Sequence, residues 1–174
     1  RRGSRPRARR VALCGGLDSE QDPGGVAKLD QFGRRARGVL SMYGGSLLQL
    51  ILGDKGAYLY AVFGAPQAHE DDAARACAAA LDLLDLERES AVVGLQVGIT
   101  HGRLRSGAYG HAERRTFTCL GDAVNVSARL MAKAPPGHAY ASDEVYAAAG
   151  ARVVCELVVS VAVPGRADPG NVFP

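Results

Sequence analysis

The alternation of apolar and polar positions along the chain predicts a mixed α+β fold. The clearest helix spans residues 69–84, where alanine, leucine and cysteine recur at helical spacing after two aspartates in the first turn. A second helix is predicted over residues 26–43, because its apolar positions share one face and a Gly-Gly pair follows. Two apolar runs joined by Gly53-Asp54-Lys55-Gly56 predict a β-hairpin.

The remaining segments extend the order to β-α-β-β-α-β-β-α-β-α-β, which favours a ferredoxin-like split βαβ core. The predicted strands span residues 11–14, 46–52, 57–63, 92–101, 115–120, 138–141 and 152–163. One further helix follows Gly121, and a short one runs from Ser142 to Ala149. The glycines at 98, 102, 107 and 110 suggest turns or bulges. We expect one mostly antiparallel sheet with helices on one face, so that the other face is open to a ligand or a partner.

The stretch from 117 to 131 reads as a strand end, a tight turn and a helix that begins near Asp122. Apolar residues at helical spacing predict its buried face, and they are Val124, Ala128 and Met131. Asn125 and Arg129 are four residues apart, so they share a different face. A carboxamide beside a guanidinium suits an anionic, oxygen-rich ligand. From spacing alone, an ordinary solvated helix face is the favoured interpretation of the pair, because polar residues four apart are common on helix surfaces.

Charge is distributed unevenly along the chain. The 174 residues carry a formal charge of +3, but residues 1–10 hold six arginines, so the remainder carries −3. This mildly acidic body argues against a nucleic-acid-binding surface. We interpret residues 1–10 as an Arg-rich linker or arm cut from a longer chain, with contact to a membrane surface or nucleic acid as the alternative. Residues 11–174 are then one domain.

Cysteine and histidine usage indicates an intracellular protein without a zinc site. The four cysteines are far apart and lie in apolar contexts, which predicts small buried core residues in a reducing compartment. The four histidines are scattered singly. No apolar run is long enough to span a membrane, so we expect a cytoplasmic protein.

Two segments carry a family resemblance that covers the chain from about Val11 to Phe173. They are YGGSLLQLILGDKGAYLYAVFGAPQAHEDDAARACAAALDLL and VGITHGRLRSGAYGHAERRTFTCLGDAVNVSARLMAKAPPG. Together they resemble the catalytic domain of class III nucleotidyl cyclases, the adenylate and guanylate cyclases. The resemblance implies a domain that pairs through its open sheet face as a homodimer or heterodimer. It also implies a purine nucleotide bound between the two chains with Mg²⁺ or Mn²⁺.

The resemblance assigns roles to residues on both halves of such a site. It implies that Asn125 and Arg129 orient the ribose and stabilise charge on the phosphate, as phosphoryl transfer requires. It places Thr118 at the edge of the base, where threonine is compatible with adenine. Asp54, after Gly53 in the hairpin turn, matches the second of two metal-binding aspartates. Without the resemblance, Asp54 is an ordinary turn residue.

The first metal-binding aspartate of the family has no counterpart in the predicted first strand. Depending on which of two neighbouring glycines is aligned, its position holds Leu13 or Ala12, and neither side chain offers the oxygen ligands that Mg²⁺ prefers. Asp18 and Asp22 lie downstream as candidate replacements. The metal half of the site is therefore expected to be incomplete.

Two basic contacts also differ from the family pattern. Leu50 stands at the position of the base-reading lysine, and Pro164 stands at that of a phosphate-binding lysine. Arg166 is close enough in sequence to reach a phosphate, although arginine does not simply replace lysine.

The expected function is therefore a class III cyclase domain that converts ATP to cyclic AMP and diphosphate in signalling. We expect weak activity alone, or dependence on a complementary partner that supplies the metal-binding carboxylates. The alternative is a catalytically inactive cyclase-like module that binds nucleotide or dimerises and regulates a larger signalling protein. A nucleic-acid-binding domain with this topology is opposed by the acidic body.

Overall fold

The computed structural model describes residues 8–18, 25–53, 56–90, 93–111, 113–155, 158–161 and 170–173. In chain order its elements are β1 (Ala8–Asp18), α1 (Gly25–Met42), β2 (Ser46–Gly53), β3 (Gly56–Phe63), α2 (Asp72–Arg88), β4 (Val93–Gly110), β5 (Arg115–Leu120), α3 (Asp122–Met131), β6 (His138–Ser142), α4 (Asp143–Ala149), a 3₁₀ turn (Gly150–Arg152), β7 (Val158–Val161) and β8 (Gly170–Phe173). The predicted order of elements is confirmed as far as α4, and β8 is an additional strand.

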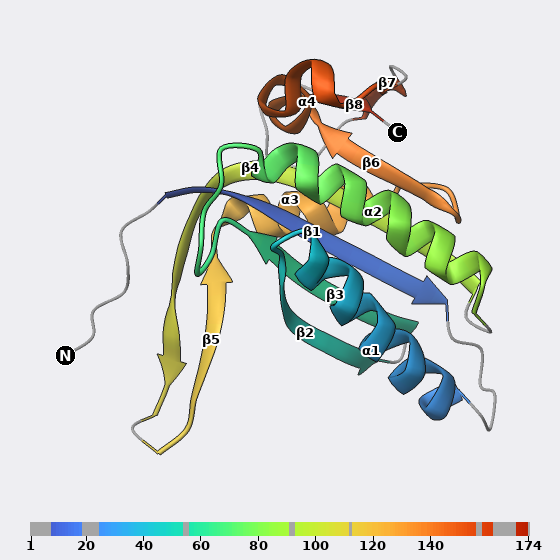
Figure 1. Cartoon of the computed structure of the whole chain (residues 1–174), viewed down its shortest axis with the longest axis vertical. Helices are drawn as coiled ribbons and strands as arrows, with labels where there is room; N and C mark the ends of the chain where they lie inside the picture. Colours follow the sequence, from blue (N-terminus) through green and yellow to red (C-terminus); the bar gives the residue numbers. More distant parts are fainter. Residues whose placement is uncertain are drawn as a thin grey trace.

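One sheet connects all eight strands (Figure 1). Its order is β2-β3-β1-β4-β6-β8-β7, and β5 pairs with β4 outside this row. Every pairing is antiparallel except that of β4 with β6. The predicted α+β class with a mostly antiparallel sheet is confirmed. Figure 1 also shows the outer half of β4 and β5 projecting from the body as a two-stranded arm.

The central strand β1 is longer than the apolar run that predicted it. It pairs with β3 on one side and β4 on the other, and these pairings continue through both of its glycines. Gly15 lies against the side chains of Leu95 and Leu59, and its lack of a side chain leaves room for them. β1 begins at Ala8, within residues 1–10, which the sequence predicted to be an Arg-rich linker.

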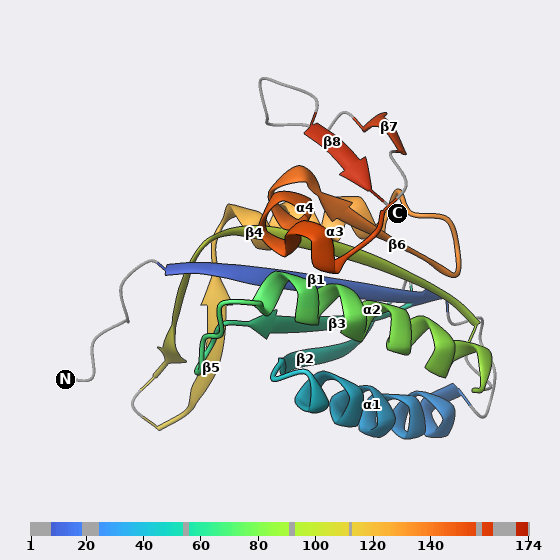
Figure 2. The same cartoon turned by 45° about the horizontal axis from the view of Figure 1, so that its top comes forward.

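The main hydrophobic core lies between the sheet and the helices α1, α2 and α4. Alternate residues of β3 enter this core, as the period of a strand requires. Phe32 and Leu40 of α1 and Leu83 of α2 are each at most 1% exposed within it. Figure 2 shows α1 and α2 side by side on this face of the sheet.

Helix α3 lies on the opposite face, so helices cover both faces in part. It packs on β4 and β1, where a second core contains Ala12, Leu104 and Met131. Gly98 and Gly102, which suggested turns, lie inside β4 and face α3. A Cβ at Gly98 would overlap backbone atoms of Ser127 and Met131, which means that the glycine permits the close approach of the helix.

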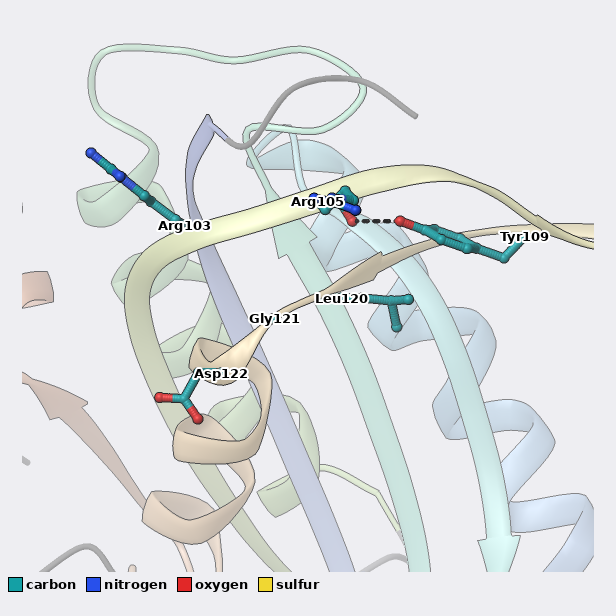
Figure 3. Close-up of a pocket in the computed structure, with 6 residues that line it drawn as sticks. All are labelled: Arg103, Arg105, Tyr109, Leu120, Gly121 and Asp122. Carbon is teal, nitrogen blue, oxygen red and sulfur yellow. Dashed lines mark hydrogen bonds between the residues drawn. The ribbon is translucent and has the colours of Figure 1, made fainter. Parts of the chain in front are cut away.

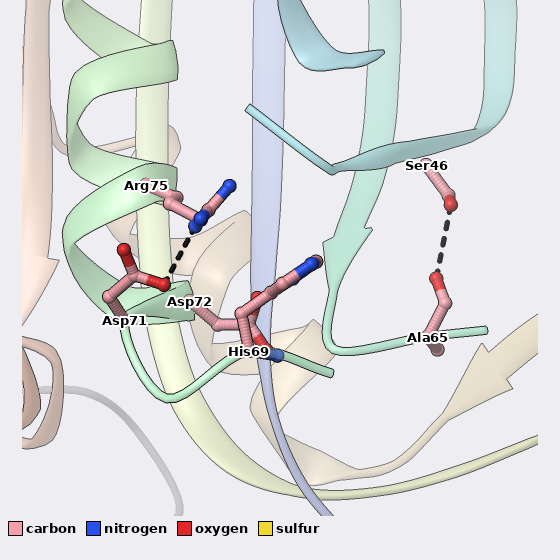
Figure 4. Close-up of polar contacts among 6 residues, drawn as sticks. All are labelled: Ser46, Ala65, His69, Asp71, Asp72 and Arg75. Carbon is pink, nitrogen blue, oxygen red and sulfur yellow. Dashed lines mark hydrogen bonds and ion pairs between the residues drawn. The ribbon is translucent and has the colours of Figure 1, made fainter. Parts of the chain in front are cut away.

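Polar contacts fix the start of α2 beside the end of β3 (Figure 4). The backbone N–H of His69 donates to the Asp72 carboxylate at 3.0 Å, and His69 Nδ1 lies 3.3 Å from its other oxygen. Arg75 Nε donates to Asp71 at 2.7 Å, which holds the pKa of the Asp71 carboxyl below its usual value. The Ser46 hydroxyl donates to the Ala65 carbonyl at 3.0 Å and ties β2 to the same region.

The long strand predicted over 152–163 is wrong. The chain leaves α4 through a 3₁₀ turn at Gly150, which has a φ of +60°, and β7 begins only at Val158. Cys77 and Cys119 are buried and Cys155 is half-buried, in line with the core role that we predicted for them. Among the described residues, no helix is long and apolar enough to cross a membrane.

Candidate functional site

The candidate site begins on the exposed side of α3. Asp122 opens the helix, and Asn125 and Arg129 follow at one-turn intervals, all exposed to solvent. The other side is anchored by Val126, Ser127, Leu130 and Met131, which are buried. We predicted Val124 and Ala128 for that side, and both are half-buried. The shared exposed face of Asn125 and Arg129 is as expected from their spacing.

Two contacts set the position of α3 against the sheet, and a hydrogen bond within the helix accompanies the second. The Thr100 hydroxyl of β4 donates to the Ala123 carbonyl in the first turn at 2.6 Å. Gly98 lets the middle of the helix approach β4 closely, and the Ser127 hydroxyl there donates back to Val124 at 2.8 Å. Since the contacts lie at the start and the middle of a ten-residue helix, the exposed side has a defined orientation.

Thr118 lies in β5, just before the turn into α3. Its neighbour Cys119 is 1% exposed, and the Cys119 carbonyl accepts a hydrogen bond from the buried Tyr60 hydroxyl at 3.0 Å. Adjacent strand residues point to opposite faces, so the half-buried Thr118 side chain lies away from that core. Tyr60 thereby connects β3 directly to the strand that carries Thr118.

Two arginines that sequence reasoning missed border the same turn (Figure 3). Arg103 and Arg105 of β4 line a cavity of about 430 Å³ together with Leu120, Gly121 and Asp122. Among the described residues, no carboxylate forms an ion pair with either guanidinium. The sequence signal for them was the pattern Arg103-Leu104-Arg105. Residues two apart in a strand point to the same face, so this pattern places both arginines on one face.

Asp122 lies between this cavity and a smaller one of about 220 Å³. The smaller cavity is lined by Arg103, His101 and Glu144 among others. The larger cavity therefore presents two guanidinium groups and one carboxylate, whereas the smaller one presents one guanidinium group and two carboxylates. The larger cavity suits binding of an anionic group such as a phosphate.

The register of β1 shows that the residues aligned with the first metal-binding aspartate lie far from the β2–β3 hairpin end. Leu13 pairs with Ala61, whereas the hairpin turn lies beyond Gly56, five residues away along β3. At the rise of a strand this is about 17 Å, too far for two ligands of one ion. The residue of β1 nearest that turn is Leu17, which pairs with Ala57, and the strand ends at Asp18. Aligning the first aspartate with Leu13 or Ala12 was therefore wrong.

The apolar positions in the middle of β1 cannot hold a metal ion. Leu13 and Ala12 are both 0% exposed in apolar surroundings. No group of three or more His, Cys, Asp or Glu residues in the described ranges could hold an ion. Asp54 and Asp22 lie outside the described residues.

The structure describes some, but not all, of the other residues predicted for the site. Gly53 pairs with Gly56, so the pairing of the hairpin is confirmed, whereas residues 54–55 of its turn lie outside the described residues. Arg166 and Pro164 lie outside the described residues. Leu50 is present on β2, but its side chain packs against Gly33 of α1 rather than on the face that carries α3.

The fold and sequence are similar to those of known cyclases. Residues 51–172 match the family model of the adenylate and guanylate cyclase catalytic domain. Adenylate cyclase type 10 of Rattus norvegicus is 30% identical over 139 residues, which is 78% of this chain and 8% of that protein's length. The guanylyl cyclase Cya2 superposes with a TM-score of 0.88 at 23% identity, covering 98% of this chain and 93% of that one. The adenylyl cyclase CyaB from P. aeruginosa gives 0.81 at 18% identity, with coverages of 96% and 94%.

Proposed function

Since this chain belongs to the adenylate and guanylate cyclase catalytic domain family, we propose that it forms one half of a cyclase site that acts on ATP with a complementary partner. In that reaction the ribose 3′-oxygen bonds to the α-phosphorus, and the bond from that phosphorus to the departing diphosphate breaks. The 3′-hydroxyl proton is released to solvent or a nearby base. The products are cyclic AMP and diphosphate.

The observation that carries the proposal is the exposed pair Asn125 and Arg129 on a firmly anchored helix. The Asn125 carboxamide both donates and accepts, so it suits a ribose hydroxyl. The Arg129 guanidinium forks onto phosphate oxygens and stabilises the charge that develops during attack. Preorganised donors of this kind typically contribute a factor of about 10²–10³ in rate.

The need for a partner follows from β1. From Val11 to Leu17 no residue of the strand carries a carboxylate, and the strand ends at Asp18. We assign the metal-binding carboxylates to the partner, and the nucleotide-orienting residues to this chain. Ile51 and Tyr58 pair across β2 and β3 on the open face and are 49% and 37% exposed, which supports association through that face.

A second candidate function is a cyclase-like module without turnover. The same run of β1 without a carboxylate, from Val11 to Leu17, favours it, because a pair of identical chains would lack that ligand twice. In this version the domain binds nucleotide or dimerises and regulates other parts of a longer protein. The matched stretch spans 8% of the length of rat adenylate cyclase type 10, one of the relatives that the chain matches, which supports a larger protein as its setting.

A complementation assay tests the first proposal. The purified chain is mixed with a class III cyclase domain whose own α3-type Asn and Arg are both replaced by Ala, and cyclic AMP is measured with ATP and Mn²⁺. We expect activity only in the mixture. Asn125→Ala in this chain should lower it by about 100-fold or more. Gln31→Ala on the exposed surface of α1 is the matched control and should leave the activity unchanged.

The outcomes separate the two candidates. Activity of the mixture that depends on Asn125 supports the half-site. No activity in any mixture, together with calorimetric ATP binding that Asn125→Ala weakens, supports the module without turnover. Absence of nucleotide binding refutes both nucleotide-dependent proposals.

A further inference from the structure

The face of β4 that carries Arg103 and Arg105 is turned away from α3. Leu104, which lies between the two arginines, is 0% exposed in the second core, and α3 packs on that core. Successive residues of a strand point to opposite faces, so both arginines lie on the other side of β4. Arg129 follows the first residue of α3 by seven positions, which is about 10 Å along the helix axis. The two arginines of β4 are therefore a group of positive charge separate from the pair on α3 that we assign to the nucleotide.

The charge of this group is not neutralised within the part of the chain that the structure describes. No carboxylate there forms an ion pair with Arg103 or Arg105, although Asp122 borders the same cavity of about 430 Å³. Arginines of the helices do have such partners, and Arg75 of α2 lies 2.7 Å from Asp71. Residues two apart in a strand are separated by about 7 Å, so the two like charges repel each other. A bound anion would remove this repulsion.

Tyr109 and Leu120 form an apolar wall beside Arg105. Leu120 lies directly opposite Arg105 across the two strands, shares its face and is 51% exposed. The Tyr109 hydroxyl reaches back along β4 and donates to the Arg105 carbonyl at 3.3 Å, as the dashed line in Figure 3 shows. Gly107 stands between them on this face and has no side chain, which leaves the Tyr109 ring room to lie along the strand. A ligand anchored at Arg105 therefore meets a leucine and a fixed aromatic ring.

We propose that this cavity binds a small organic phosphate, with the phosphate at Arg105 and Arg103 and the apolar body against Tyr109 and Leu120. A guanidinium group forks onto phosphate oxygens. A phosphate monoester carries about two negative charges near neutral pH, which matches two arginines, whereas a carboxylate carries one. The cavity volume lies in the range of small-ligand sites. The site does not depend on the proposed function, because neither Asn125 nor Arg129 lines the cavity.

Calorimetry on the full chain tests the proposal with phenyl phosphate, inorganic phosphate and benzoate as probes. We expect phenyl phosphate to bind about threefold or more tightly than inorganic phosphate, because its ring is buried against Tyr109 and Leu120. Benzoate has the ring but a single charge, so it should bind about tenfold more weakly than phenyl phosphate.

Two pairs of variants separate the contributions of charge and ring. Arg105→Gln should weaken phenyl phosphate by about tenfold or more. Arg115→Gln removes the same charge from β5 on the opposite face, since its neighbour Thr116 is the residue opposite Tyr109, and should leave the affinity unchanged. Tyr109→Ala should abolish the preference for phenyl phosphate over inorganic phosphate, and Tyr109→Phe should retain it. Circular dichroism verifies that each variant is folded.

Each other outcome overturns the inference. If no probe binds, or if Arg105→Gln and Arg115→Gln weaken binding equally, the cavity is not a phosphate site. Equal affinities for phenyl phosphate and inorganic phosphate refute the organic ligand. If Arg129→Ala abolishes binding and Arg105→Gln does not, the anion is bound at α3; the inference is then wrong and the proposed function stands.

Discussion

Gly98→Ala is expected to displace α3, the helix that carries Asn125 and Arg129. The new Cβ would overlap the carbonyl oxygen of Ser127 and the backbone nitrogen of Met131, and both are backbone atoms that cannot rotate away. Normal contact between carbon and oxygen is about 3.3 Å or more, so the helix must move outward by about 1 Å. Overpacking of this kind costs about 1–3 kcal/mol, and we expect the upper end.

For a chain of this length, about 3 kcal/mol lowers the midpoint of thermal unfolding by roughly 6–12 °C. Circular dichroism or calorimetry measures the shift, and the affinity for ATP should fall with it. Gly38→Ala is the control, because Gly38 lies on the exposed side of α1 with no atom near its absent Cβ. There alanine should stabilise the helix by up to about 1 kcal/mol. A loss of less than about 2 °C for Gly98→Ala would refute the packing argument.

Three further predictions concern buried groups. Thr100→Val removes the side-chain hydrogen bond to the Ala123 carbonyl, which as a helical carbonyl keeps its backbone partner, and should cost about 0.5–1.5 kcal/mol in urea unfolding, with an unchanged m-value. Tyr60→Phe removes the hydrogen bond to Cys119 and should destabilise the domain by about 1 kcal/mol, measured in the same way; no change would mean that solvent replaces this bond. Burial raises the pKa of the Cys77 thiol from 9.0 to about 12, so a thiol reagent at pH 8 should label it only after unfolding, as followed by mass spectrometry. Because folding raises this pKa, the protonated Cys77 thiol favours the folded state. This contribution to the free energy of unfolding should be complete below pH 9 and lost as the pH rises toward 12.

Local chemistry was enough to predict helix α3. A glycine followed by an aspartate marks a helix start, and a spacing of four residues places Asn125 and Arg129 on one face whatever the helix packs against. The alternation of β3 and the glycine-rich turn before it predicted the hairpin for the same reason, since both signals lie within a few residues.

The pairing register of the strands could not be predicted from the sequence. The position of Leu13 relative to the hairpin depends on pairing with β3, and the direction of Leu50 depends on a bulge in β2. A slip of one residue reverses every side chain, so counting from a motif fails wherever a bulge intervenes. Gly98 was likewise read as a turn, because only the packed helix explains a glycine in mid-strand.

The burial of β1 on both faces limits where the strand can accept a charged side chain. An aspartate introduced at Leu13 would sit in a dry apolar core, where an unpaired carboxylate costs several kcal/mol. One at Ala12 would face Tyr60 and Leu104 in the second core, with the same penalty. Folding stability therefore keeps carboxylates out of the middle of this strand and leaves its end, at Asp18, as the place where β1 carries one.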